Sequence, residues 1–463
     1  MHDHKSRHHR NRSIKNAVST ALVSKGSTAI LQFVSLPVAA RVLGREEFGV
    51  YATISMAVFM VAILQVGVGP ALARGISEAS AKGDETRQGR LYINGAFLVV
   101  ALALLGYLIA ALLISAVPIP TLFGEEYRPF AEQMRPALWV GLSLILGDII
   151  ISMTDRVREG YMESGTVNAW AAAGNLVGAI VVFVGIQFQP SISFLLIAVF
   201  APNIVARIFS TALLLKKRPW LIRSGARPDR ATMIELVRDG VSFSATSIIV
   251  YIVEFAVCAL IVGRIAGPDS VALFQIFMAL TTAFTGMLVM IGRPFWAAIV
   301  DAKSRGDHDW MAGATRRYYL YLAVLVAGAS IGLIGLGPWI LPKLYGEEFA
   351  ASRVLFVCHA IFLAAIGWRE VNRYLAIGLG LLPKAVLPIL SGLFVGLLLG
   401  TLGLREWGLP ALYVGLAIGT ALIPGWKLPL LIRAEFDRSN TAKKGPGSSS
   451  AEPTISNISK TAV

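Results

Sequence analysis

The sequence is short of charged residues. Asp, Glu, Lys and Arg make up 15% of the 463 residues, whereas hydrophobic residues make up 55%, and the mean hydropathy is +0.66. Soluble domains carry about 25% charged residues. The shortage excludes a soluble globular protein and predicts a chain that lies almost wholly within a bilayer.

The sequence also lacks the motifs of common enzymes. No Gly-x-x-x-x-Gly-Lys-Ser/Thr loop occurs, which excludes nucleotide hydrolysis of the P-loop kind. Only His308 and His359 lie beyond the N-terminal tail, and the tail histidines have no partner cluster elsewhere. Cys258 and Cys358 fall in apolar stretches, where buried free thiols are expected. We expect no metal, no cofactor and no catalytic site.

An integral-membrane enzyme, such as an acyltransferase or a polysaccharide polymerase, is the alternative from another class. A polymerase usually has a large periplasmic loop. The stretches between the apolar segments of this chain are short, so the sequence disfavours that alternative.

Apolar stretches of about 20 residues are long enough to cross a bilayer as helices. The sequence contains twelve of them, approximately at 17–40, 48–70, 92–117, 136–154, 166–187, 193–215, 239–263, 270–292, 317–341, 353–375, 385–402 and 409–432. The predicted fold class is therefore an all-α integral membrane protein with about twelve transmembrane helices.

Basic residues are distributed unequally between the two sides of this arrangement. If the N-terminus is cytoplasmic, the inside loops receive most of the Lys and Arg residues, Arg369 and Arg373 among them. The outside loops receive only Arg41, Arg45, Arg128, Lys343 and Arg405. This asymmetry predicts a multi-pass inner-membrane protein with both termini cytoplasmic. The net charge of +14 then reflects topology and contact with anionic lipid headgroups, and we expect no nucleic-acid partner.

Three sequence blocks recur in order at nearly constant spacing. The pairs are 41–51 with 264–274, 78–84 with 301–307, and 122–127 with 344–349. We infer two copies of one six-span unit. Since the number of spans is even, the copies are parallel repeats, which form two lobes around a central cavity and suit alternating access. Within the blocks, Gly44 and Gly267 are expected to end helices. We interpret the blocks as contacts that hold the structure together, in preference to contacts with a ligand.

These features predict the domain organisation. A basic cytoplasmic tail at 1–16 precedes a six-helix lobe at 17–216, and a cytoplasmic linker at 217–236 leads to a second lobe at 237–433. A disordered cytoplasmic tail is expected at 434–463.

Three segments of the first repeat resemble a known family. The segments 40–51, 71–79 and 122–127 are similar to the bacterial polysaccharide flippases of the Wzx type, in the polysaccharide transporter family of the MOP exporter superfamily. The resemblance implies translocation of undecaprenyl-pyrophosphate-linked oligosaccharide from the cytoplasmic to the periplasmic leaflet. The polymer is then an O-antigen, a capsule or an exopolysaccharide, and the implied partners include a polysaccharide polymerase and chain-length proteins.

Other transporters stay open as alternatives. A multidrug-type exporter of small molecules belongs to the same superfamily. A major-facilitator carrier also has six plus six parallel spans, but its Asp-Arg-x-Gly-Arg signature is incomplete here, because Thr86 precedes Arg87-Gln88-Gly89-Arg90.

Ionisable residues within spans are candidates for function because burying them is costly. Family flippases line their cavity with basic groups, and the resemblance implies that Lys25 in the first span binds the anionic head group. Arg264, Arg293 and Asp148 are further substrate-binding candidates. Glu254 is the candidate for ion coupling, a role that Asp148 could also fill. Alternatively, Lys25 pairs with Glu254 across the lobes, or extends to the cytoplasmic interface.

Overall fold

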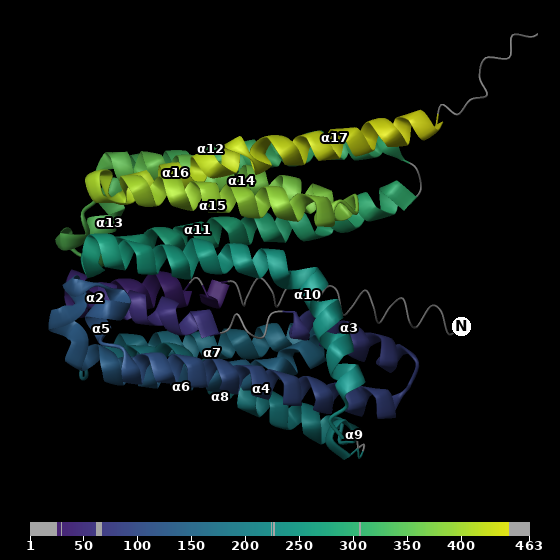
Figure 1. The fold of residues 1–463 in the computed structure, drawn as a ribbon, viewed down its shortest axis with the longest axis horizontal. Coiled ribbons are helices and arrows are strands. Elements are labelled where there is room, and N and C mark those ends of the chain that lie inside the picture. Colours follow the sequence, from purple (N-terminus) through teal and green to yellow (C-terminus); the bar gives the residue numbers. More distant parts are fainter. Residues whose placement is uncertain are drawn as a thin grey trace, which may run out of the picture.

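The computed structural model describes residues 26–28, 30–61, 67–223, 225, 227–304 and 307–443. Within these residues the chain is almost entirely helical and contains no strand. Two helical bundles lie side by side, and their helices run roughly along the long axis of the molecule (Figure 1).

The first bundle contains η1 to α8 and the short helix α9. Its elements are η1 (Leu31–Ser35), α2 (Leu36–Phe59), α3 (Val68–Ala81), α4 (Glu85–Ala116), α5 (Ile119–Phe123), η3 (Glu125–Phe130), α6 (Ala131–Gly160), α7 (Ser164–Gly185), α8 (Ile192–Lys217) and α9 (Trp220–Arg223). We call this bundle the first lobe.

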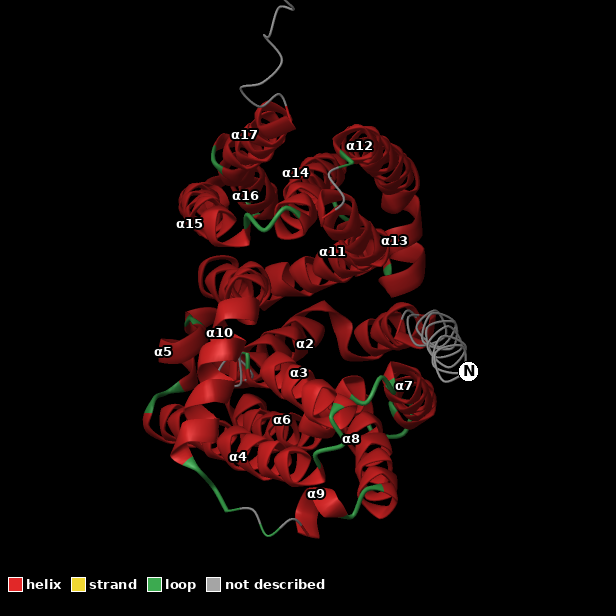
Figure 2. Ribbon diagram, turned by 90° about the vertical axis from the view of Figure 1, so that its right-hand side faces the viewer, coloured by secondary structure: helices red, strands yellow, loops and turns green. Residues whose placement is uncertain are grey.

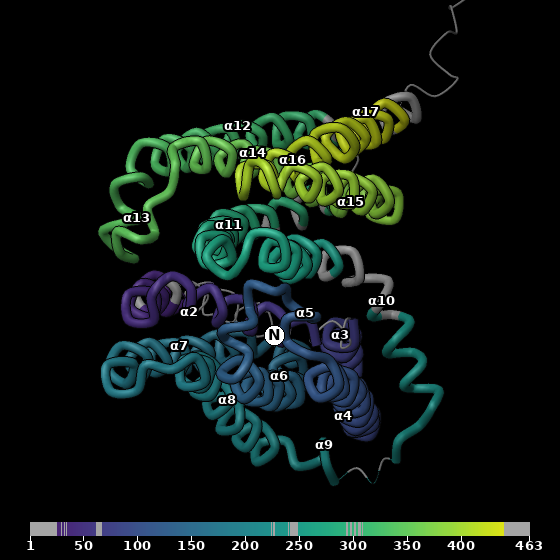
Figure 3. The backbone as a smooth tube through the Cα atoms, turned by 60° about the vertical axis from the view of Figure 1, so that its left-hand side comes forward, coloured from purple at the N-terminus to yellow at the C-terminus, as the bar shows by residue number. Residues whose placement is uncertain are grey.

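The second lobe is built from the C-terminal half. Its elements are α10 (Arg230–Ile252), η4 (Val253–Val257), α11 (Cys258–Ser304), α12 (His308–Ile331), η5 (Gly332–Leu336), α13 (Gly337–Tyr345), η6 (Glu347–Phe349), α14 (Arg353–Gly378), α15 (Leu382–Trp407), α16 (Leu409–Leu422) and α17 (Pro424–Lys443). Helix α10 passes from α9 along α3 and α4 before it enters this lobe (Figure 3). Helices α2 and α11 pack against each other between the lobes (Figure 2).

Glycines turn the chain at equivalent places in the two lobes. Gly44 within α2 has φ +74° and ψ 170°, and Gly267 within α11 has φ +76° and ψ 175°. Side chains rarely tolerate positive φ, so glycine is required here. The predicted helix ends at both glycines are confirmed. Gly124 and Gly346, in the third pair of blocks, also match, with φ +124° and +118°.

The turns of the second pair of blocks match as well. Asp84 begins α4 by accepting a hydrogen bond from the Arg87 amide, and Asp307 begins α12 by accepting one from the Trp310 amide. The described glycine turns and aspartate helix starts of the three blocks therefore match between the two copies.

Nine helical stretches of the described residues are long and apolar enough to cross a membrane. One of them, Ile249–Gly292, contains the turn at Gly267 and so includes two helices. The total of about twelve spans stays a prediction. Two boundaries differ from the expected domains: α10 begins at Arg230, inside the expected linker, and α17 continues to Lys443, beyond 433.

Helices α5 and α13 lie at one end of the long axis, and α9 and the C-terminal end of α17 lie at the other (Figure 1). We call these the α5 end and the α9 end.

Candidate functional site

A cavity of about 250 Å³ lies between the lobes. The first lobe lines it with η1, α2 and α8, and the second lobe with α10, η4 and α11. Every described residue that lines it is uncharged. We call it the interlobe cavity. Its lining includes Ser35, Tyr51, Tyr251, Phe255 and Gln275.

A π-helical segment borders the cavity in each lobe. Residues Leu31–Ser35 form one, and residues Val253–Val257 form the other. Their first residues are 222 positions apart, the same spacing that separates Leu122 from Leu344 in the duplicated blocks. Such segments often occur at functional sites because they shift the helix face that meets a ligand. The duplicated unit thus presents an irregular helix to the cavity twice.

Three polar atoms in the cavity wall are unsatisfied. Ser35 Oγ, Ser55 Oγ and Gln275 Oε1 are buried and have no hydrogen-bond partner among the described residues. Leaving such an atom unpaired costs about 1–3 kcal/mol. A ligand or water that enters the cavity can satisfy these atoms.

Aromatic rings form another part of the wall. Tyr251 and Phe255 are stacked, with ring centroids 4.3 Å apart. The edge of this pair meets Phe59 of the first lobe, 5.7 Å from Tyr251. The aromatic group therefore spans both lobes.

The α5 end of the molecule is closed by contacts between duplicated blocks. The first block of the first lobe docks on the third block of the second lobe. Arg45 donates a hydrogen bond to the Glu348 carbonyl at 2.6 Å, and Arg41 donates one to the Lys343 carbonyl. The Phe48 ring meets Phe349 edge to face at 5.9 Å.

The reciprocal contact joins the first block of the second lobe to the third block of the first. Arg264 donates to the Thr121 carbonyl at 3.4 Å, and a Cβ at Gly263 would lie 2.5 Å from the Tyr127 hydroxyl. Where the two first blocks meet, a Cβ at Gly49 would lie 1.9 Å from the Pro268 carbonyl oxygen. We call these contacts the clasp (residues 41–49, 121–127, 263–269 and 343–349). The duplicated blocks thus fasten one lobe to the other.

The α9 end is bridged by α10, which packs on the first lobe. The Asp229 amide donates to Asn94 Oδ1 at 2.6 Å, and Arg87 pairs with Glu235 at 3.5 Å. A Cβ at Gly240 would lie 2.1 Å from the Gly67 carbonyl oxygen. Helix α10 therefore packs directly on α3 and α4.

A polar cluster next to this bridge holds α9 in place. Gln88 accepts hydrogen bonds from Tyr161 at 2.6 Å and from Trp220 at 2.9 Å. Glu163 accepts from Arg158 and Arg218, both at 2.6 Å. Burial raises the pKa of Glu163, but Arg218 and a neighbouring lysine outweigh it, so the net pKa lies below its ordinary value.

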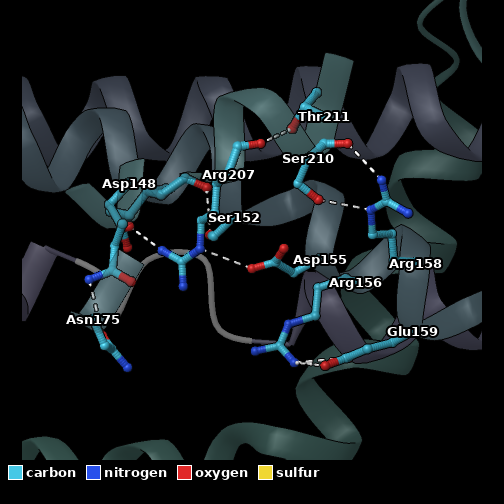
Figure 4. Close-up of polar contacts among 12 residues, drawn as sticks. Asp148, Ser152, Asp155, Arg156, Arg158, Glu159, Asn175, Arg207, Ser210 and Thr211 are labelled. Atoms are coloured by element: carbon cyan, nitrogen blue, oxygen red, sulfur yellow. Dashed lines mark hydrogen bonds and ion pairs between the residues drawn. The ribbon is translucent and has the colours of Figure 1, made fainter. Parts of the chain in front are cut away.

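An ion-pair cluster lies inside the first lobe (Figure 4). Arg207 of α8 lies between Asp148 and Asp155 of α6, with its Nε 3.0 Å from Asp155 Oδ2 and its Nη1 paired with Asp148. The three side chains are 13–25% exposed. When both carboxylates are ionised, the cluster carries one surplus negative charge. We call it the Asp148–Arg207–Asp155 cluster.

A balanced ion-pair chain lies inside the second lobe. Glu254 of η4 accepts two hydrogen bonds from Arg369 of α14, at 2.5 Å and 3.2 Å. Arg369 also lies 3.4 Å from Glu370, which pairs with Arg373 at 2.6 Å. The Glu254 and Arg369 side chains are only 7% and 3% exposed. Arg369 and Arg373 lie within α14 and are paired there, which corrects their assignment to a cytoplasmic loop.

The structure describes the side chains of three of the residues proposed from sequence, Asp148, Glu254 and Arg264, and they lie apart from one another. Asp148 and Glu254 are in different lobes, and each pairs with an arginine of its own lobe. Arg264 is exposed at the clasp. Lys25 lies outside the described residues, and so does the side chain of Arg293. The expected pairing of Lys25 with Glu254 stays untested, but Glu254 has a partner in Arg369.

The sequence analysis did not propose several residues that belong to the cavity wall or to the buried ion pairs. Arg369 has a readable signal, because it lies within the apolar stretch 353–375. Ser35 and Gln275 have none, since neutral polar residues are common in membrane helices and no pattern distinguishes these two.

Comparisons with solved structures identify the fold. An inward-facing multidrug resistance MATE family transporter of the MOP superfamily aligns with a TM-score of 0.73 at 14% identity, covering 92% of this chain and 99% of the other. An outward-facing structure of a transporter of the same description gives 0.62 at 14% identity, covering 92% and 96%. A MOP superfamily transporter from Pyrococcus furiosus, described by a reversed polarity of its binding pocket, gives 0.64 at 14% identity, covering 92% and 97%.

Sequence comparison identifies the family. No curated protein matches the chain significantly. A scan against protein families matches residues 13–295 to the family described as polysaccharide biosynthesis protein. The match covers more than half of the chain and confirms the resemblance found in the first repeat. The chain therefore belongs to the polysaccharide biosynthesis protein family and is a multi-pass membrane protein with the fold of MOP superfamily transporters.

Proposed function

We propose that the protein moves undecaprenyl-pyrophosphate-linked oligosaccharide repeat units across the inner membrane for surface or secreted polysaccharide biosynthesis. The observation that carries this proposal is the interlobe cavity, which lies between two copies of one unit that also contact each other through the clasp. Membership of the polysaccharide biosynthesis family supplies the substrate class.

Alternating access follows from the symmetry of the clasp. Because each lobe supplies the same two surfaces, rocking the lobes apart breaks the Arg45–Glu348 and Arg264–Thr121 contacts together. With both termini cytoplasmic, as the loop charges predict, the clasp is the periplasmic gate. Helix α10 then lies on the cytoplasmic side, where its packing on α3 and α4 must rearrange as the substrate enters.

Ion coupling fits the first lobe better than the second. The Asp148–Arg207–Asp155 cluster has a surplus carboxylate that one proton or monovalent cation would neutralise. Glu254, the residue proposed from sequence, already has a fixed cation in Arg369. We therefore assign coupling to the first-lobe cluster, and we assign to Glu254 the role of joining η4 to α14.

The anionic head group needs a basic partner. Lys25 fits this role by its place in the sequence, three residues before Thr28, which lines the interlobe cavity. Arg293 and Arg264 follow as secondary candidates. Lysine provides a point charge to phosphate oxygens, whereas arginine binds them with two parallel hydrogen bonds.

Export of small molecules is the second candidate function, because the similar solved structures include multidrug transporters. A polymerase and chain-length proteins would act on the product only under the first proposal.

A deletion strain tests the proposal. We expect loss of surface or secreted polymer and accumulation of lipid-linked repeat units in the cytoplasmic leaflet, both reversed by re-expression. Normal polymer without trapped lipid, in a strain lacking any second flippase, would contradict the proposal and favour small-molecule export.

A further inference from the structure

The wall of the interlobe cavity selects against charge. Every described residue that lines it is neutral. The nearest carboxylate along η4, that of Glu254, lies next to Phe255 in sequence but is bound by Arg369 at 2.5 Å and 3.2 Å. A charged group that enters such a cavity gives up hydration and finds no counter-charge among the described residues of this wall, which is unfavourable.

The polar atoms of the wall require hydrogen-bonding partners. Gln275 Oε1 can only accept a hydrogen bond, so it needs a donor such as a hydroxyl or an amide N–H. Ser35 Oγ can donate or accept. The two atoms come from different lobes, so one ligand that bonds to both bridges the lobes. A hydroxyl-rich molecule meets both requirements.

The aromatic wall adds a flat apolar surface. The stacked Tyr251 and Phe255 rings, with Phe59 at their edge, can pack against the C–H face of a pyranose ring while its hydroxyls point elsewhere. Pockets for small ligands usually measure about 300–1,000 Å³, so a cavity of about 250 Å³ fits one sugar unit and not a whole oligosaccharide.

We infer that the interlobe cavity binds one uncharged sugar unit of the substrate and discriminates against acidic sugars and lipophilic cations. This inference rests on the proposed function and specifies its substrate class. The pyrophosphate then binds beside this neutral wall, on the basic residues proposed above.

Binding to the purified full-length protein in lipid nanodiscs tests the inference. The probe is tritiated octyl glucoside below its critical micelle concentration, and the competitors are octyl glucuronide and tetraphenylphosphonium. We expect saturable binding, with both charged competitors weaker than unlabelled octyl glucoside by about tenfold or more, since each would be desolvated without a counter-charge. Competition by either one as effective as that of octyl glucoside would overturn the inference.

Substitutions in the wall assign the binding to this cavity. Gln275→Ala and Ser35→Ala should each weaken octyl glucoside binding by about tenfold, because each removes one hydrogen bond to the sugar. Gln189→Ala, on an exposed residue between α7 and α8, is the matched control and should bind like the wild type. Unchanged binding by both wall variants, with normal elution on size exclusion, would place the sugar elsewhere and refute the inference.

A charge substitution gives the sharpest test. Gln275→Glu places a carboxylate of nearly the same shape in the wall. We expect this variant to lose affinity for octyl glucoside and to gain affinity for tetraphenylphosphonium. A variant that keeps the wild-type order of affinities would contradict the inference.

The two levels of the proposal fail in different experiments. Normal polymer in the deletion strain, combined with selective binding of octyl glucoside, would reject the flippase and keep the sugar site. Trapped lipid-linked units, combined with equal binding of glucoside and glucuronide, would keep the flippase and reject the neutral-sugar inference.

Discussion

The two lobes share their backbone but not their charges. Both have the glycine turns, the aspartate helix starts and the π-helical segments at equivalent positions. The first lobe places two half-buried carboxylates around Arg207, whereas the second joins two carboxylates and two arginines in a chain that includes the buried Glu254–Arg369 pair. The duplicated parts contribute to the cavity and the clasp, and we propose that the divergent parts give each lobe a separate electrostatic role. The following substitutions test that division, from the largest expected effect to the smallest.

Breaking the second-lobe ion pair should have the largest effect on stability. Arg369→Met leaves the buried Glu254 carboxylate without its partner, which costs about 3–5 kcal/mol of folding stability. The double variant Arg369→Met, Glu254→Gln should regain much of the loss, because the unpaired charge is gone. Thermal unfolding in detergent measures both. If the double variant unfolds at the same temperature as the single one, the charge balance is not what stabilises this lobe.

Crowding the clasp should open the α5 end. A Cβ at Gly49 would lie 1.9 Å from the Pro268 carbonyl oxygen, so Gly49→Ala cannot keep the closed contact. Spin labels at the exposed positions Glu46 and Glu347 should report a longer distance in this variant. Gly313→Ala in α12 is the matched control, because a Cβ there meets no atom within 4 Å. An unchanged distance distribution in Gly49→Ala would mean that the clasp does not limit opening.

Removing the surplus charge should affect coupling in the first lobe only. Asp155→Asn leaves one carboxylate for Arg207, so the cluster has no site for an extra cation. We expect transport by this variant to stop responding to an imposed proton or sodium gradient. Glu254→Gln should keep the response, at lower protein stability. Lipid-linked sugar translocation in vesicles, with and without each gradient, measures the difference; loss of the response in Glu254→Gln alone would move coupling to the second lobe.

The cluster at the α9 end should have a small, pH-dependent effect. The pKa of Glu163 is lowered in the folded state, so its stabilisation is present above the unfolded pKa of about 4.3 and is lost as the pH falls through the folded value. Glu163→Gln should lower stability near pH 7 by about 1 kcal/mol and reduce the difference between pH 7 and pH 4. Glu125→Gln, in an exposed pair with Arg128, is the control and should change neither. Equal acid sensitivity of Glu163→Gln and the wild type would refute this role.

The sequence predicts the framework better than the site. Apolar length and the duplicated blocks predict helices, two lobes and the turns at Gly44 and Gly267, because these depend on local chemistry. The charged residues Asp148 and Glu254 can also be found from the local sequence, because each lies within an apolar stretch. Their partners Arg207 and Arg369 are 59 and 115 positions away, so only the packing of the lobes shows which arginine pairs with which carboxylate.

The neutral wall of the cavity could not be predicted at all. Ser35 and Gln275 become distinctive only because the fold buries both without a partner. Lys25 and Arg293, which the sequence favours, stay predictions because their side chains lie outside the described residues.

The most direct test of the central proposal is translocation by the purified protein. Proteoliposomes would contain a radiolabelled undecaprenyl-pyrophosphate-linked sugar in the inner leaflet, and an external glycosidase would report its arrival in the outer leaflet. We predict rapid cleavage with the wild-type protein, slower cleavage with Gln275→Ala, and only background cleavage in empty liposomes. Cleavage at the background rate with correctly folded wild-type protein, with and without a proton or sodium gradient, would contradict the proposal that this chain is a flippase.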